Sequence, residues 1–77
     1  MSTTAREIMT SDVAHLIEED SVVVAAERMA ELGVGSLPIC TTDRHLVGMV
    51  TDRDIVVDVV AKGQDPAQVQ VGRLAQG

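Results

Sequence analysis

The residues best suited to chemistry lie at positions 48–55, in the sequence Gly-Met-Val-Thr-Asp-Arg-Asp-Ile. An apolar run ends at Thr51, and apolar residues then recur at helical spacing from Ile55. We therefore expect a strand that leads directly into a helix beginning at Thr51 or Asp52. A helix start offers backbone N–H groups and the positive end of the helix dipole, to which Thr51 and Asp54 add a hydroxyl and a carboxylate. Together these groups could contact the ribose and phosphate of a nucleotide.

The same residues also fit a purely structural role. Thr51 as N-cap, with Asp54 three residues later, approximates a capping box, which would satisfy N–H groups at the helix start without any ligand. Nucleotide contact and helix capping are therefore equal alternatives for both residues. For Arg53 a solvated surface charge is favoured over a phosphate contact, because it has no basic neighbour.

The hydrophobic pattern of the rest of the chain predicts the elements that would position this junction. A first helix over residues 22–32 has Ser21 as its N-cap and Gly33 as its stop. The second helix should run from Thr51 or Asp52 to its stop at Gly63. Strands are expected over residues 13–17, 34–40 and 46–50, giving the order β-α-β-β-α.

The connections predict a mixed sheet. The first two strands are separated by a helix and can lie parallel through a right-handed crossover, whereas the last two form an antiparallel hairpin. Pro38 lies inside the second strand and lacks an N–H group, so this strand should be an edge strand or meet the sheet at a bulge.

The length of 77 residues indicates one small domain, which buries only ~60% of the surface of its unfolded chain. Cys40 is the only cysteine, so no disulfide within the chain is possible. His15, Cys40 and His45 are too isolated for a structural zinc site. We therefore expect the domain to associate with another chain or another domain.

Composition argues against several functions. The absence of Phe, Tyr and Trp and the net charge of −6 argue against nucleic-acid binding. No apolar run approaches the ~20 residues needed to cross a bilayer, and no signal-like segment follows the N-terminus. With a lone thiol, this favours the cytoplasm. No constellation of catalytic residues is evident, so we expect no enzyme.

In combination, four features make the chain resemble a cystathionine-β-synthase (CBS) domain, of the kind found in small bacterial proteins made of little besides CBS motifs. They are the lead-in Glu7-Ile8-Met9-Thr10, a helix with Ala25-Ala26 and Met29, the segment 33–39, and the segment 48–55. The resemblance implies an α+β fold with a small three-stranded mixed sheet and two helices on one face. Residues 1–12 would form a lead-in, 13–63 the CBS motif, and 64–77 a connector toward a possible second motif.

The resemblance also implies a regulatory role. CBS motifs usually occur in tandem pairs, called Bateman modules, whose clefts bind adenosine compounds such as AMP, ADP, ATP or S-adenosylmethionine. This chain carries a single motif, so it is either a fragment of a tandem protein or a unit that pairs with an identical chain. We expect a homodimer, or pairing with a second CBS motif, through the two helices. The residues expected at that contact are Val22, Ala26, Met29, Ile55, Val59 and Val60.

By the same resemblance, Asp54 would contact the ribose, and Thr51 would contribute a hydroxyl or phosphate contact. Arg53 and the helix start are the remaining positive features, whereas Asp52 and the net charge oppose a polyphosphate. A low-charge adenosine ligand is therefore favoured over ATP, and no cofactor is obligatory. The purine pocket would be lined, largely through backbone, by Val34, Gly35, Ser36 and Ile39, with Thr10 near its mouth.

Two further hypotheses remain open. The chain could be a structural domain that dimerises without nucleotide, with Thr51 and Asp54 serving only as helix caps. A weaker alternative is a redox-sensitive dimer that forms through Cys40.

Overall fold

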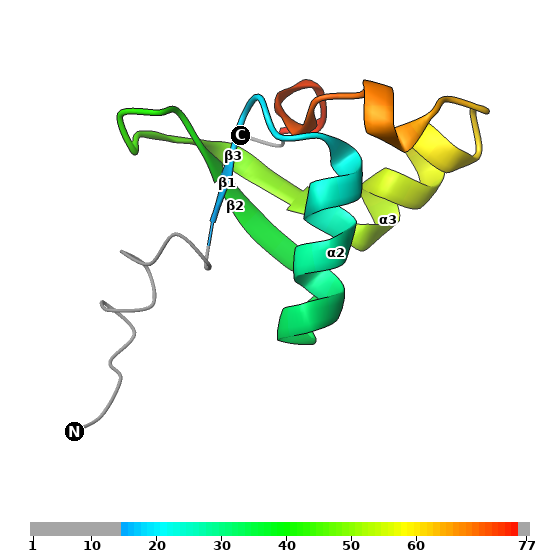
Figure 1. Cartoon of the computed structure of the whole chain (residues 1–77), viewed down its shortest axis with the longest axis horizontal. Helices are drawn as coiled ribbons and strands as arrows, with labels where there is room; N and C mark the ends of the chain where they lie inside the picture. The colour runs from blue at the N-terminus through cyan, green and yellow to red at the C-terminus, as the bar shows by residue number, and fades with distance from the viewer. Residues whose placement is uncertain (1–14, 76–77) are drawn as a thin grey trace.

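Within residues 15–75, three strands form one mixed sheet in the order β1-β2-β3. β1 (Leu16–Ile17) runs parallel to β2 (Ser36–Cys40), and β2 pairs antiparallel with β3 (Leu46–Thr51). Helices α2 (Val22–Leu32) and α3 (Asp52–Ile55) lie together on one side of this sheet (Figure 1). This computed structural model describes residues 15–75. The α+β class, the mixed sheet and the element order predicted from the sequence are confirmed.

β2 is the central strand, so the prediction that Pro38 makes it an edge strand is wrong. The alternative of a bulge agrees better, because the register with β3 shifts between Ile39 and Cys40. Within the described residues, β1 pairs only with Ile39 and Cys40. Among residues 15–75, Pro38 therefore pairs with a strand on one side only, at Met49, and its missing N–H group interrupts no second ladder there.

Helix α2 has the bounds and caps that the sequence predicts. The Ser21 side chain accepts a hydrogen bond from the Val24 N–H (3.3 Å). At the other end, Gly33 has a φ of 69°, and its N–H donates to the Met29 carbonyl (2.8 Å). This left-handed conformation is the usual reason for glycine after a helix. The poor helix propensity of three consecutive valines is overridden because Val22 is fully buried in the core.

The second helix changes its winding after one turn. α3 continues directly into the π-helix η2 (Val56–Val60), where the Ala61 N–H donates to the Val56 carbonyl (2.8 Å). The helix ends at Val60 instead of continuing to Lys62, and residues 61–63 form a turn with Gly63 at a φ of 73°. The predicted glycine stop is thus present, but the wider helical turn closes before it.

The expected first and second strands are longer than those observed. Residues 34 and 35 link α2 to β2 and are not part of the strand. Of the strand expected over residues 13–17, only Leu16 and Ile17 are β1, and residues 13 and 14 lie outside the described part of the chain. Within residues 15–75, no helix has the length and apolar character to cross a membrane.

The segment after the second helix packs onto the domain as two short 3-10 helices, η3 (Pro66–Gln68) and η4 (Val71–Leu74). The Val22 N–H donates to the Val69 carbonyl, and the Val71 N–H donates to the Asp20 carbonyl, both at 2.8 Å. Assignment of residues 64–77 as a connector stays a prediction, but the described part of this tail supplies core residues. The buried apolar core comprises Leu16, Val22, Ala25, Met29, Leu37, Ile39, Val50, Ile55, Val59, Val69, Val71 and Leu74.

Candidate functional site

The strand-to-helix junction at Thr51 is a complete capping box. The Asp54 N–H donates to Thr51 Oγ1 (3.0 Å), and the Thr51 N–H donates to Asp54 Oδ2 (3.0 Å). Thr51 has extended backbone angles, as an N-cap residue does. Thr51 and Asp54 therefore cap the helix without any ligand, as one of the two alternatives from the sequence expected.

The protein itself occupies every other N–H group at this helix start. The Asp52 N–H donates to the Gly35 carbonyl (2.9 Å), and the Arg53 N–H donates to Asp52 Oδ1 (2.8 Å). Both Asp52 and Asp54 place carboxylates in the first turn, where they already interact with the helix dipole. A phosphate at this point would find negative charge and no free backbone donor, so the helix start does not favour one.

The predicted site segments 34–36 and 51–54 meet at one edge of the sheet. Ser36 is the register partner of Thr51, next to the hydrogen bond between Asp52 and Gly35. A Cβ atom on Gly35 would lie 3.2 Å from Asp52 Oδ2, so this approach leaves little room for any larger residue. Val34 and Ser36 are exposed, and Thr51 and Asp54 are half-buried. This edge therefore offers an apolar side chain, backbone and a carboxylate together.

The remaining predicted site residues do not join this edge through their side chains. Ile39 is fully buried in the core and pairs with Gly48, further along the β2–β3 ladder. Arg53 is exposed, in agreement with the solvated role that the sequence favours. Thr10 lies outside the described residues.

Most of the residues expected to contact a partner belong to the core instead. Val22, Met29, Ile55 and Val59 are buried, whereas Ala26 and Val60 are exposed. The prediction is wrong for the four buried residues, because the faces that carry them pack onto the sheet and the tail. Sequence periodicity identifies an apolar face, but it does not tell whether the chain itself or a partner covers that face.

A different apolar surface on the second helix is exposed. It consists of Val56, Val57 and Val60, which are 57%, 42% and 56% exposed, and we call it the valine patch. Of these three residues, the sequence analysis expected only Val60 at the contact with a partner. The sequence Val-Val-Asp-Val-Val could have indicated the other two. It places apolar side chains all round the helix, and one buried face cannot cover all of them.

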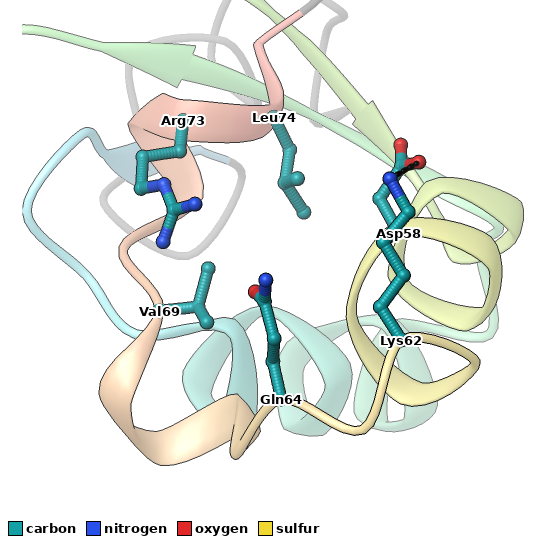
Figure 2. A pocket seen from close by; sticks show the side chains of 6 residues that line it. All are labelled: Asp58, Lys62, Gln64, Val69, Arg73 and Leu74. Carbon is teal, nitrogen blue, oxygen red and sulfur yellow. Dashed lines mark ion pairs between the residues drawn. The ribbon is translucent and has the colours of Figure 1, made fainter.

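A pocket lies at the opposite end of the second helix from the capping box, between that helix and the tail (Figure 2). Its volume is about 220 Å³. The sequence analysis missed it because its walls come from two segments whose charged residues show no local pattern. It is lined by Asp58, Lys62, Gln64, Val69, Arg73 and Leu74.

Possible metal ligands and the single thiol do not come together in the part of the chain that the structure describes. No group of three or more His, Cys, Asp or Glu residues there could hold a metal ion. Cys40, at the end of β2, is a half-buried free thiol.

Known proteins with similar sequences or structures have this same fold. The family model of the CBS domain matches residues 5–60. The chain therefore belongs to the CBS domain family, as the sequence motifs indicated.

One sequence match and two structure matches show what the chain is similar to. Hypoxic response protein 1 of Mycobacterium tuberculosis is 46% identical over 74 residues, which are 96% of this chain and 52% of the relative. A crystal structure of Hypoxic Response Protein I with two coordinated zinc ions superposes with a TM-score of 0.79 at 46% identity, covering 95% of this chain and 61% of that one. A crystal structure of CbpB in complex with c-di-AMP has a TM-score of 0.76 at 18% identity, covering 87% and 47%. This chain thus spans about half the length of its mycobacterial relative.

Proposed function

We propose that this chain is a regulatory, non-catalytic ligand-binding module that pairs with another CBS motif and senses an adenosine-containing nucleotide. The observation that carries the proposal is the hydrogen bonding of the two carboxylate oxygens of Asp54. Its Oδ2 atom caps the helix, while its Oδ1 atom has no hydrogen-bond partner among residues 15–75. One carboxylate oxygen is thus fixed by the fold, and the other is available to accept hydrogen bonds from a ribose diol.

The surroundings of Asp54 favour a ligand with little charge. The N–H groups of the helix start are already bonded, and Asp52 lies next to them. We infer that the ribose and base make the contacts at this edge and that the phosphates point away from it. Exposed Val34 could pack against the base, with Gly35 and Ser36 contributing backbone. The c-di-AMP complex of CbpB shows an adenine nucleotide on a protein of this fold, at an identity that extends only to the fold.

Pairing is the second half of the proposal. The valine patch presents three apolar side chains on one short helix. A second CBS motif would remove this patch from water, which supports pairing in a domain of this size. We propose that this partner is either an identical chain or another motif of a longer polypeptide, in the reducing cytoplasm.

The test is calorimetric titration of AMP, ATP and S-adenosylmethionine into wild-type protein and Asp54→Asn. The asparagine side chain keeps an oxygen for the Thr51 N–H and replaces the other oxygen with an NH₂ group. We expect Asp54→Asn to stay folded and to lose at least tenfold in affinity for AMP. Asp43→Asn, in the exposed hairpin turn, is the matched control and should bind as wild type does.

A second candidate function is a structural pairing domain that binds no nucleotide, and the completeness of the capping box favours it. Absence of binding by all three adenosine compounds in a protein that is still paired would support this alternative. Equal affinities of wild type and Asp54→Asn would also contradict the proposed ribose contact.

A further inference from the structure

The pocket of Figure 2 joins two parts of the chain that are distant in sequence. Asp58, Lys62 and Gln64 come from the end of the second helix and its turn, and Arg73 and Leu74 come from η4. It is separated from the capping box by the length of the helix. Nothing in the proposed nucleotide site uses these residues.

The polar groups of the pocket are mainly hydrogen-bond donors. Figure 2 shows the Arg73 guanidinium on the tail side, the Lys62 side chain on the helix side, and the Gln64 amide between them. Lys62 and Arg73 are two of only six basic residues in a chain whose net charge is −6. This is therefore a local concentration of positive charge on an acidic protein.

Asp58 is the only acid in the lining, and Lys62 partly neutralises it. The Lys62 Nζ atom lies 3.8 Å from Asp58 Oδ1, a long contact between two side chains that remain 62% and 38% exposed. Such an exposed pair is weak, so the ammonium group keeps donors for a ligand. The Arg73 guanidinium can offer a planar oxyanion two parallel N–H groups.

The volume of the pocket and its apolar wall further restrict the kind of ligand that fits. The volume of about 220 Å³ is below the range of roughly 300–1,000 Å³ that is typical of pockets for drug-sized molecules. Val69 and Leu74, which are buried core residues, supply an apolar wall. The pocket is thus suited to a small oxyanion with at most a short carbon skeleton.

We propose that this pocket binds a small oxyanion, a phosphate or a carboxylate, between Arg73 and Lys62, with Gln64 donating a further hydrogen bond. Because Arg73 belongs to the tail and Lys62 to the turn after the second helix, the bound anion holds η4 against the domain. The ligand would thereby stabilise the position of residues 66–75.

The test is an NMR titration of the full chain with sodium phosphate, glycerol phosphate and sodium acetate, at constant ionic strength maintained with sodium chloride. We expect saturable shifts of the backbone amides of Gln64 and Arg73. The stronger of the phosphate and acetate series identifies the oxyanion that is preferred. Arg73→Gln and Lys62→Gln should each weaken binding about tenfold, and either variant suffices if the other does not fold.

Arg53→Gln is the matched control, because it removes an exposed cation at the other end of the helix. It should leave the dissociation constant unchanged. Shifts that rise linearly with anion concentration, that persist in both pocket variants, or that centre on Arg53 would overturn the proposal. This titration uses no nucleoside, so its result is independent of the nucleotide proposed above.

Discussion

Thr51 and Asp54 could each cap the helix or contact a ligand. The structure shows which of their atoms are taken up by capping. Thr51 Oγ1 and Asp54 Oδ2 cap the helix, whereas Asp54 Oδ1 accepts no hydrogen bond from residues 15–75 and is the atom proposed to contact a ligand. Removing the hydroxyl therefore tests stability, while exchanging the carboxylate for an amide tests binding. At this scale, the capping role and the proposed ligand contact can be measured independently although they share two residues.

The hydrogen bond that Thr51 Oγ1 accepts predicts that Thr51→Val destabilises the fold. This substitution keeps the branched shape and removes the oxygen that accepts the Asp54 N–H. We expect the free energy of unfolding to fall by about 1 kcal/mol, the usual cost of losing an N-cap. Urea denaturation measures it, with Thr51→Ser as the control that restores the hydroxyl. A Thr51→Val protein as stable as wild type would show that the cap contributes nothing.

At the scale of elements, η4 contributes to the core although it lies beyond the expected CBS motif. Val71 is fully buried, and the Gly72 N–H donates to the Glu18 carbonyl (3.0 Å). A Cβ atom on Gly72 would lie 3.0 Å from that same carbonyl oxygen, so glycine is needed for this close approach. The tail is therefore held to the β1 end of the domain by both backbone and side chains.

This packing predicts that Val71→Ala lowers the free energy of unfolding by roughly 2 kcal/mol, the cost of two buried methyl groups and the cavity left behind. Val57→Ala makes the same chemical change at an exposed position and should alter stability by less than about 0.5 kcal/mol. Denaturation of both variants, at a concentration where the protein is not associated, provides the comparison. Equal effects would mean that η4 is not part of the folded unit.

At the scale of the whole molecule, the domain is small and leaves apolar surface exposed on one helix. Val56→Lys combined with Val60→Lys places two charges at the two most exposed side chains of the valine patch. We expect the monomer to remain folded and the dissociation constant of the pair to rise at least tenfold, because a partner would have to bury both ammonium groups. Analytical ultracentrifugation over a dilution series measures this constant.

The control for the pairing experiment adds charge elsewhere. Thr42→Lys with Asp43→Lys lies in the exposed hairpin turn, away from the second helix, and should leave association unchanged. Association that survives the valine substitutions would exclude the valine patch as the pairing surface. A wild-type protein that is monomeric at high concentration would contradict self-association itself.

Features that depend on neighbours in sequence were predictable. The Ser21 cap, the Gly33 stop and the capping box at Thr51 each involve residues within about four positions of one another. The order of elements and the family motifs followed from the same local patterns. The approach of segment 34–36 to segment 51–54 followed from the hairpin, because two antiparallel strands place the ends of that hairpin together.

Sequence patterns alone were thus enough to predict the caps, the order of strands and helices, the CBS family and the edge where Asp54 lies. Three features emerge only when the chain is folded: the Pro38 strand is central, Val59 faces inward while Val60 faces outward, and the tail closes a pocket with Arg73. The two groups of features differ in how far apart along the chain the interacting residues lie. Hydrogen bonds at caps and turns connect near neighbours, whereas burial depends on which distant apolar surfaces compete for the same face, and only the folded chain settles that competition.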